Sequence, residues 1–391
     1  MTGKPALDLW PARATIDLDA ITGNVRALRE RVCGAELMAG VKADAYGHGL
    51  VPSARAALAG GACALGVAQP TEALALRAAG ITAPVLTWLV APGADLAPLG
   101  EAGVEVATSA PWVLDELAAA ARSTGRPAVA QLKVDTGLGR NGAFGLPLSA
   151  DPRTDWSDLV DRAARLEAEG VLRVRGVFTH FAYSDAPQHP TVRAQQEAFA
   201  DAVGLAERAG LRPEVRHLSN SAATLTSPSS TWDMVRPGLA IYGLSPVPDL
   251  GGADDFGLRP AMRVAATAAV VKRVAAGQGV SYGHTYRTER ESTLVDVPLG
   301  YADGVPRHAS NRGPVQVGGR RFTVTGRVCM DQLVVDVGDQ QVEAGDEVVL
   351  FGAGDQGEPT AQDWAEAADT ISYEIVARIG PRVPRVYTGA P

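Results

Sequence analysis

The sequence predicts an α/β protein whose N-terminal domain is a (β/α)8 barrel of the TIM type and whose C-terminal domain is mainly β. At 391 residues the chain is long for one compact core, so two domains are expected. Between residues 12 and 247, short apolar runs alternate with Ala-rich helical stretches. Eight βα units in about 235 residues are typical of a closed barrel, and a doubly wound open sheet is the alternative.

The first helical stretch illustrates the pattern. Asp19 can cap its start, because a carboxylate oxygen accepts hydrogen bonds from the free N–H groups of a first helical turn. Ile21, Val25, Leu28 and Val32 then recur at helical spacing and form one apolar face. The sequence therefore predicts an amphipathic helix ahead of the first barrel strand.

Eight apolar runs are the predicted barrel strands: residues 37–41, 64–67, 85–89, 105–107, 130–134, 174–179, 215–218 and 235–241. Barrel enzymes carry their reactive groups at the C-terminal ends of the strands. Polar residues stand at or near several of these ends, namely Lys42, Lys133, His180, Asn220 and Ser221, and Arg236 lies in the eighth run. Because a buried cation is costly unless it is paired, cations converging on one end of the barrel predict an anionic ligand such as a cofactor phosphate.

The C-terminal part of the chain differs from the N-terminal part in composition and in predicted secondary structure. Residues 244–260 are rich in Pro, Gly and Asp and are expected to form a linker. Glycine-bounded β runs follow at 293–297, 322–325 and 348–351. We therefore predict a barrel domain over residues 12–247 and a β domain over residues 248–391, with residues 1–11 associated with the β domain.

Composition narrows the classes of partner and location. The net charge of −8 argues against a nucleic-acid partner, because no basic stripe is available for phosphate backbones. No apolar run is long enough to cross a bilayer, and residues 1–8 lack the apolar segment of a signal peptide. Cys33, Cys63 and Cys329 are scattered, which favours a reducing compartment, so the cytoplasm is the expected location.

The sharpest motif is VKADAYGHG at residues 41–49. A lysine at the end of a buried strand can form a Schiff base with an aldehyde cofactor, and the glycines that follow let the backbone turn closely around it. This segment is similar to the active-site lysine motif of the alanine racemase family, and the resemblance extends from residue 16 to residue 385. Its other landmarks are KVDTGLGR at 133–140, FTHF at 178–181, NSA at 220–222, VRPG at 235–238, SYG at 281–283, GYADG at 300–304 and CMDQ at 329–332.

The resemblance implies a pyridoxal 5′-phosphate (PLP) enzyme that racemises a small amino acid, most simply alanine, and so supplies D-alanine for the cell wall. Lys42 would bind the cofactor and transfer the α-proton on one face of the substrate, and Tyr282 would act on the other face. His180 and Arg236 would support Tyr282 through hydrogen bonds. Arg236 would also face the pyridine nitrogen, where a permanent cation disfavours protonation of the ring.

The resemblance also implies binding groups for the phosphate and for the substrate. Hydroxyl groups and backbone N–H groups would hold the cofactor phosphate, and the cofactor site includes Tyr46, Asn220, Ser221, Gly238 and Leu239. Arg140 and the backbone of Met330 would bind the substrate carboxylate. Lys133 matches a position that is often carbamylated in the family, and its carbamate would orient Arg140; an ordinary lysine in an ion pair is the alternative.

In the family, the loops that match Tyr282 and Met330 enter the active site of a neighbouring subunit, which implies a head-to-tail homodimer. One departure concerns the phosphate site. A tyrosine often precedes the terminal RVPR segment in the family, and this chain has Pro381 there; Tyr373 and Tyr387 are near in sequence but cannot be placed at the site.

Other interpretations stay open at this stage. The same catalyst could act on serine or on several small amino acids, or the chain could be a PLP-dependent decarboxylase or a non-catalytic PLP-binding protein. The Asp135-Thr136-Gly137 triplet resembles an aspartic-protease signature, but it occurs once. His217 and His284 are expected to pack or to form hydrogen bonds, and no residues have metal-ligand spacing.

Overall fold

The computed structural model describes residues 10–32, 34–144, 155–227 and 230–390; Cys33 and residues 1–9 lie outside the described residues. The chain divides into two compact units. The barrel unit comprises Ile21–Ala43 and Leu50–Leu258. The β unit comprises Arg259–Ala390, Asp44–Gly49 and the described part of residues 1–20. The domain limits predicted from the sequence, at residues 12, 247 and 248, stay a prediction.

The barrel unit is a nearly closed ring of parallel strands. In spatial order the strands are β10 (Met234–Val235), β2 (Glu36–Gly40), β3 (Ala64–Val67), β4 (Val85–Thr87), β5 (Glu105–Thr108), β6 (Ala128–Asp135), β8 (Leu172–Phe178) and β9 (Val215–His217), and β7 (Ala143–Phe144) pairs with β6. The two ends of this order meet, because Asp233 N donates to Arg216 O at 3.1 Å and Arg236 N donates to Ser219 O at 2.8 Å. The predicted barrel is confirmed, and the open-sheet alternative is wrong.

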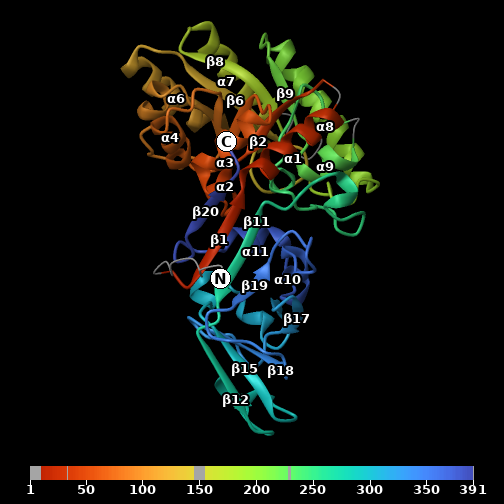
Figure 1. Cartoon of the computed structure of the whole chain (residues 1–391). Helices are drawn as coiled ribbons and strands as arrows, with labels where there is room; N and C mark the ends of the chain where they lie inside the picture. Colours follow the sequence, from red (N-terminus) through yellow and green to blue (C-terminus); the bar gives the residue numbers. More distant parts are fainter. Residues whose placement is uncertain (1–9, 33, 145–154, 228–229, 391) are drawn as a thin grey trace. The chain divides into compact units, whose positions relative to one another are not determined.

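Helices cover the outside of the strands (Figure 1). They are α1 (Leu18–Arg31), α3 (Leu50–Ala59), α4 (Pro70–Ala78), α5 (Ala97–Glu101), α6 (Pro111–Thr124), α7 (Asp155–Ala168), α8 (Pro190–Arg208) and α9 (Ser221–Thr226). The predicted cap of α1 is wrong by two residues. Asp17 Oδ1, at the end of the preceding strand, accepts from Ala20 N at 3.0 Å, and Asp19 lies inside the first turn. Within the described residues, no helix combines the length and the apolar character needed to span a bilayer.

The eighth predicted strand is too long. Residues 235–241 were expected to be extended, but β10 ends at Val235 and Leu239–Tyr242 form a 3-10 helix, η2. Pro237 has no N–H to donate to a neighbouring strand, and the backbone turns at Gly238, where ψ is −85°. The N–H groups of Gly238 and Ala240 donate instead to Ser221 Oγ, at 2.8 and 3.2 Å.

The barrel interior is packed rather than hollow, as in other barrels of this size. Seven strands each contribute one side chain to a buried cluster: Met38, Ala64, Leu86, Ala107, Phe178, Val215 and Met234. Two buried polar side chains, those of Gln131 and His217, lie in the same interior and are hydrogen-bonded to each other. The side chains at the C-terminal ends of the strands are therefore supported by a packed interior.

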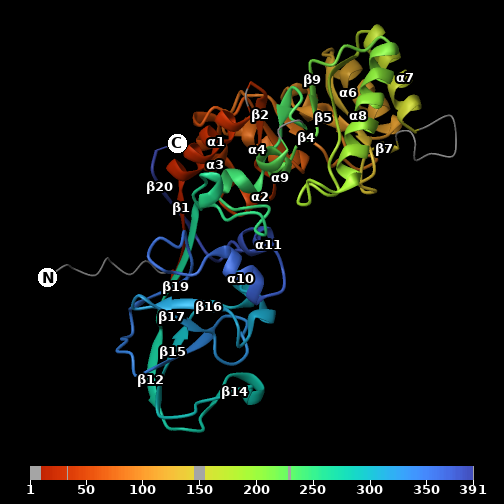
Figure 2. The same cartoon turned by 90° about the vertical axis from the view of Figure 1, so that its right-hand side faces the viewer.

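The β unit contains a six-stranded sheet and a smaller three-stranded sheet (Figure 2). The larger sheet has the order β17 (Arg320–Thr323), β16 (Pro314–Val317), β19 (Glu347–Phe351), β11 (Met262–Thr267), β1 (Ala12–Asp17) and β20 (Arg385–Thr388). The smaller sheet contains β12 (Val270–Val274), β15 (Ser292–Val297) and β18 (Leu333–Gly338), and β13 (Gly279–Val280) pairs with β14 (Tyr286–Arg287). Helices α10 (Ala361–Ala367) and α11 (Ser372–Ala377) complete the unit, which confirms the predicted mainly β domain.

The segment that follows β2 is a left-handed helical turn, labelled α2 (Lys42–Tyr46). Four consecutive non-glycine residues, from Ala43 to Tyr46, have φ between 52° and 55°. Each left-handed residue costs about 1–2 kcal/mol, so the surrounding structure must offset several kcal/mol here.

Hydrogen bonds and close packing hold this turn in the β unit. Gly49 N donates to Asp44 O at 2.9 Å, and Arg385 Nε donates to Gly47 O at 2.9 Å. His48 Nδ1 lies 3.0 Å from two carbonyl oxygens, those of Ala45 and Tyr46, so Nδ1 carries the ring proton. Burial lowers the pKa of His48 to about 4, so the ring is neutral at physiological pH.

We expect Gly47→Ala to destabilise the protein more than a glycine substitution that introduces the same backbone strain alone. Gly47 has φ +79°, and a Cβ there would lie 2.4 Å from Val376 O. Gly277, in the same unit, has φ +82° and no atom within 4 Å of the added Cβ. Gly277→Ala should cost about 1 kcal/mol from backbone strain, and Gly47→Ala about 1–3 kcal/mol more from overpacking. Melting temperatures of the two purified variants compare these costs; equal losses would contradict the close packing at Gly47.

Candidate active site

Four cationic side chains influence one another at the end of the barrel that carries Lys42. Burial lowers the pKa of Lys42, and the charges of Arg140 and Arg236 lower it further. Burial lowers the pKa of Lys133 to about 8, again with contributions from Arg236 and Arg140. Two carboxylates oppose these effects, Glu72 at Lys42 and Asp135 at Lys133. Four cations facing two carboxylates leave an excess of positive charge that suits an anionic ligand.

Aromatic rings lie beneath this charge. The Lys42 Nζ atom is 5.8 Å from the centroid of the Trp88 ring. Phe178 lies under two cations, with its centroid 5.2 Å from Arg236 Cζ and 5.7 Å from Lys133 Nζ. An aromatic face attracts a cation through its quadrupole, so both rings stabilise charge that is partly removed from water.

Arg236 is held by hydrogen bonds to backbone carbonyl oxygens and to imidazole rings. Its Nη1 atom is 2.9 Å from His217 Nδ1, and its Nη2 atom donates to Thr179 O at 2.7 Å. His180 Nδ1 lies 3.4 Å from the same Nη2 atom, so the predicted pair of His180 and Arg236 is brought together. Burial and the nearby cations, Arg236 first, hold the pKa of His180 well below its usual range, so its ring is a neutral acceptor.

Arg236 keeps its charge despite this environment. Burial lowers the pKa of its guanidinium to about 9, which still leaves it protonated at neutral pH. Sequence reasoning assigned His217 only a packing or hydrogen-bonding role. The structure places it directly behind Arg236, with its ring stacked on Phe178 at a centroid distance of 5.0 Å and an interplanar angle of 11°.

Asp135 orders the loop that carries Arg140. Its Oδ1 atom accepts from the backbone N–H groups of Gly137, Leu138 and Gly139, at 2.9, 2.9 and 3.2 Å. Its Oδ2 atom accepts from Arg140 N at 3.1 Å. A carboxylate that accepts four backbone N–H groups fixes the loop, and this accounts for the Asp-Thr-Gly triplet without protease chemistry. The side chain of Arg140 is exposed, and Lys133 is buried on β6 two residues before Asp135.

Polar groups predicted to bind phosphate meet beside the end of β2. Ser221 Oγ accepts from Gly238 N, as described above, and Leu239 is the buried first residue of η2. Gly40 N donates to Pro237 O at 2.8 Å, and a Cβ at Gly40 would lie 3.2 Å from Gly238 Cα. This close approach brings Gly238 to the strand that leads into Lys42.

Asn220 has a clear structural role next to this group. Its Oδ1 atom accepts from Ala223 N at 3.1 Å and caps α9, and its Nδ2 atom donates to Ser184 Oγ at 2.8 Å. The cap holds Ser221 at the start of the helix. The contact of Asn220 with a cofactor stays a prediction.

Tyrosines gather around the left-handed turn in the β unit. Tyr46 is buried, which raises the pKa of its hydroxyl group, and its ring centroid is 6.2 Å from that of Tyr373. The hydroxyl group of Tyr387 approaches Gly49 so closely that an added Cβ would lie 2.0 Å from it. The sequence could not place these two tyrosines, because they come from α11 and β20, more than three hundred residues after Tyr46. Pro381, where a tyrosine was expected, is exposed.

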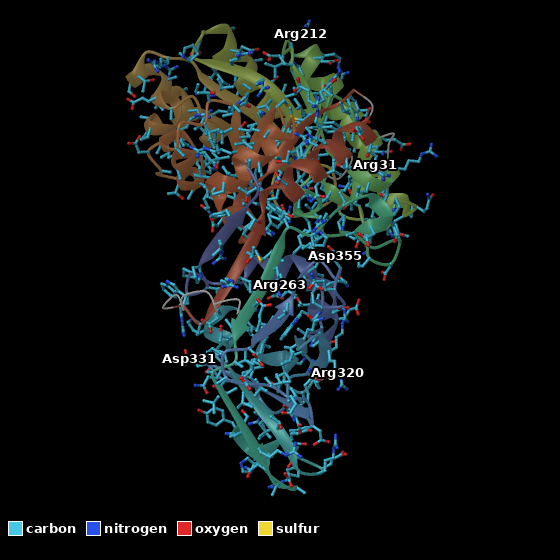
Figure 3. The ribbon with its side chains drawn as sticks, in the orientation of Figure 1. Arg31, Arg212, Arg263, Arg320, Asp331 and Asp355 are labelled. Atoms are coloured by element: carbon cyan, nitrogen blue, oxygen red, sulfur yellow. The ribbon has the colours of Figure 1, made fainter. Side chains whose placement is uncertain are left out.

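Tyr282 and Met330 lie on one exposed surface of the β unit. They line a pocket of about 460 Å³ together with Ser281, Cys329, Asp331 and Gln332; Figure 3 shows Asp331 on this part of the molecule. Tyr282 is 70% exposed and Met330 is 53% exposed, which is unusual for side chains of this size and polarity.

The two loops are held together by short contacts. Ser281 Oγ donates to Arg327 O at 2.6 Å and lies 3.3 Å from Cys329 Sγ. A Cβ at Gly300 would lie 2.2 Å from Met330 O, so only glycine fits at that position. The β unit therefore presents Tyr282 and Met330 as one surface.

Comparison with known proteins places this geometry in a family. Residues 16–246 match the family model described as the N-terminal domain of alanine racemase, and residues 261–387 match the C-terminal domain model. The chain is 58% identical to alanine racemase of Frankia casuarinae over 385 residues, which is 98% of each chain. It is 54% identical to the crystal structure of alanine racemase from Streptomyces lavendulae, with a TM-score of 0.95 and coverage of 98% and 99%. A structure from Bacillus anthracis with bound L-Ala-P is 34% identical, with a TM-score of 0.88 and coverage of 98% and 96%.

We expect Asp135→Ala to destabilise the barrel unit by about 2–4 kcal/mol, because four backbone N–H groups would lose a charged acceptor. Asp115→Ala is the matched control: Asp115 forms a 2.6 Å ion pair with Arg162, but both side chains are exposed, so its loss should cost about 1 kcal/mol or less. Urea denaturation followed by tryptophan fluorescence measures both variants. Similar midpoints for the two would show that Asp135 does not order the loop.

Proposed function

The chain belongs to the alanine racemase family, and we propose that it interconverts L-alanine and D-alanine with pyridoxal 5′-phosphate bound at Lys42. Family membership makes it an isomerase that acts on an amino acid. The observation that supports the cofactor site is the excess of buried positive charge around Lys42. We further propose that the product serves cell-wall synthesis and that the enzyme works in the cytoplasm.

The described residues fit this cofactor. Its phosphate is an anion that suits the excess positive charge at the barrel end. Ser221 and the backbone N–H group of Leu239 would bind it, together with the N–H group of Gly238 once that group exchanges Ser221 Oγ for the phosphate. Lys42 has a lowered pKa, which increases the fraction of neutral amine available to attack an aldehyde. When bound, the cofactor supplies a conjugated ring that withdraws electrons from the α-carbon as its proton leaves.

Tyrosines complete the proposed phosphate site. We assign Tyr46 a hydroxyl contact with the phosphate, as the family resemblance implies. Tyr373, whose ring neighbours that of Tyr46, would supply the second hydroxyl group that Pro381 cannot. Asn220 would contribute through the helix cap that holds Ser221.

Arg236 would face the pyridine nitrogen. Its fixed hydrogen bonds to His217 and Thr179 leave the guanidinium little freedom to turn. A guanidinium that stays charged at neutral pH disfavours a second positive charge on the ring nitrogen. His180, bound to the same guanidinium, would continue the hydrogen-bond chain toward Tyr282.

Two bases on opposite faces of the α-carbon would invert its configuration. Lys42 would remove or return the proton on one face, and Tyr282 would do so on the other. We propose that Tyr282 and Met330 act in the site of a second copy of the chain, in a head-to-tail homodimer. Their high exposure supports this arrangement, because a partner would cover them.

The substrate carboxylate would be bound by Arg140 and by the backbone N–H group of Met330. Lys133 would orient Arg140 as a carbamate. Its pKa of about 8 leaves part of the amine neutral and able to react with carbon dioxide. The resulting carbamate would replace a repelling cation near Arg140 with an attractive anion. A fixed Asp135 loop would hold Arg140 in place for both contacts.

Circular dichroism tests the reaction. We expect the purified protein to convert L-alanine to the racemate at constant total amino acid, while its spectrum shows the visible band of a bound cofactor. L-serine assayed in parallel measures the breadth of the substrate pocket, and carbon dioxide release would indicate a decarboxylase.

Lys42→Ala should lower turnover by at least about a thousandfold, because it removes both the cofactor attachment and one base. Undiminished turnover by Lys42→Ala would overturn the assignment of this lysine, and a band without turnover would indicate a binding protein.

Tyr282→Phe should make α-proton exchange strongly one-sided. With one base left, exchange of the α-proton with solvent deuterium should persist from one enantiomer and fall by about 10²–10⁴-fold from the other. Proton NMR of L-alanine and D-alanine in deuterium oxide measures both rates. Equal rates from the two enantiomers would remove Tyr282 from the mechanism.

The same two variants also test the shared site. In a head-to-tail dimer, a Lys42→Ala chain paired with a Tyr282→Phe chain forms one site with neither side chain and one site with both. Mixing the two variants, with exchange of subunits, should therefore restore racemase activity. Activity that stays at the level of the separate variants, despite mixed dimers detected by native mass spectrometry, would show that each site belongs to a single chain.

A further inference from the structure

A chain of buried side chains runs through the barrel interior behind Arg236. Gln131 Nε2 donates to Glu105 Oε2 at 2.5 Å, and Gln131 Oε1 lies 2.6 Å from His217 Nε2. His217 Nδ1 lies 2.9 Å from Arg236 Nη1. At its far end, Glu105 forms an ion pair with Arg175. This series of side chains therefore connects an ion pair at the start of β5 to the guanidinium at the proposed cofactor site.

The donors and acceptors in this chain can point in only one direction. Glu105 forms an ion pair with Arg175, and a carboxylate can only accept, so the amide nitrogen of Gln131 faces Glu105 and the amide oxygen faces His217. His217 Nε2 must then carry the proton, which leaves Nδ1 as an acceptor. A guanidinium can only donate, and Arg236 Nη1 meets that acceptor.

The backbone is shaped to hold Gln131 in this position. The pairing of β6 with β8 shifts register between Ala130 and Gln131, so that Gln131 pairs with Gly176 and one residue of β8 is passed over. A Cβ at Gly176 would lie 2.9 Å from Gln131 Oε1 and 2.8 Å from Val215 O. Glycine at this bulge therefore leaves the space that the glutamine amide occupies.

We propose that Glu105 and Gln131 are positioning residues that fix His217 as its Nε2–H tautomer and thereby orient Arg236. The tautomer follows from the barrel alone, and only its consequence for catalysis rests on the proposed function. With the opposite tautomer, two N–H donors would face each other between His217 and Arg236, and the guanidinium would lose one of its fixed contacts.

Glu105→Gln tests this proposal. A glutamine at this position can donate to Gln131 Oε1, which lets the Gln131 amide turn and present its nitrogen to His217. We expect nitrogen-15 NMR of histidine-labelled, cofactor-free protein to show His217 as Nε2–H in the unmodified chain and as a mixture with Nδ1–H in Glu105→Gln. The His217 signals are identified by their loss in His217→Asn. Binding of PLP should weaken about tenfold in Glu105→Gln, as for the loss of a hydrogen bond to a charged group.

Glu214→Gln is the matched control. Glu214 Oε2 also lies near Arg175, 3.8 Å from its Nε atom. Because Glu214 is exposed and is not one of the hydrogen-bonded side chains that link Glu105 to Arg236, the same substitution should leave the His217 tautomer unchanged. Gln131→Met removes the link itself while keeping a side chain of similar size, and it should also give mixed tautomers. Circular dichroism establishes that each variant is folded.

Two results would overturn the proposal: an Nδ1–H tautomer in the unmodified chain, or a pure Nε2–H tautomer in both Glu105→Gln and Gln131→Met. Failure of the proposed function would be seen differently. A chain that neither binds PLP nor racemises alanine would leave the tautomer result intact, because the NMR measurement needs no cofactor.

Discussion

The strongest constraint on this structure is the positive charge that is buried where the barrel strands end. Lys42, Lys133 and Arg236 are all partly removed from water, and among the described residues two carboxylates, Glu72 and Asp135, raise the pKa of the two lysines. Aromatic faces, carbonyl oxygens and neutral histidine rings hold these cations without cancelling their charge. Added carboxylates would stabilise the empty protein, but they would also remove the attraction for an anionic ligand. The site therefore trades stability for binding, as functional sites commonly do.

Two backbone features turn this charge into a defined geometry. The left-handed turn after Lys42 is costly in itself, and hydrogen bonds from Arg385 and His48 hold it in place. The loop from Thr136 to Arg140 is fixed by one carboxylate that accepts four N–H groups. The strained turn follows Lys42 directly in the sequence, and the hydrogen-bonded loop ends at Arg140. Each feature therefore adjoins a side chain that is proposed to act on the substrate. Each feature is specified by a few residues, which makes both accessible to single substitutions.

The sequence predicts the architecture well because barrel strands are short apolar runs at regular intervals, and seven of the eight end within two residues of the observed ends. The eighth fails because apolar residues after Pro237 form a 3-10 helix, which short apolar runs do not distinguish from a strand. Lys42 and His180 became candidates because they follow predicted strands, whereas Arg236 was expected inside the eighth strand and follows β10 only because that strand ends at Val235. The contacts of Glu105, Gln131 and Tyr373 could not be predicted, because they join distant segments and, for Gln131, involve a bulge that has no sequence signal. The left-handed turn was also unexpected, since only its glycines suggested an unusual backbone.

The place of β1 in the larger sheet of the β unit has a consequence for biosynthesis. This strand is almost the first described part of the chain, yet its two neighbours are β11 and β20, near residues 262–267 and 385–388. At a translation rate of about 5–20 residues per second, β1 waits roughly 20–70 seconds on the ribosome for its second partner. Arg385, which holds the turn next to Lys42, arrives with that partner. A nascent chain can therefore build its barrel strands early, but the turn beside the lysine reaches its final form only after Arg385 has been synthesised.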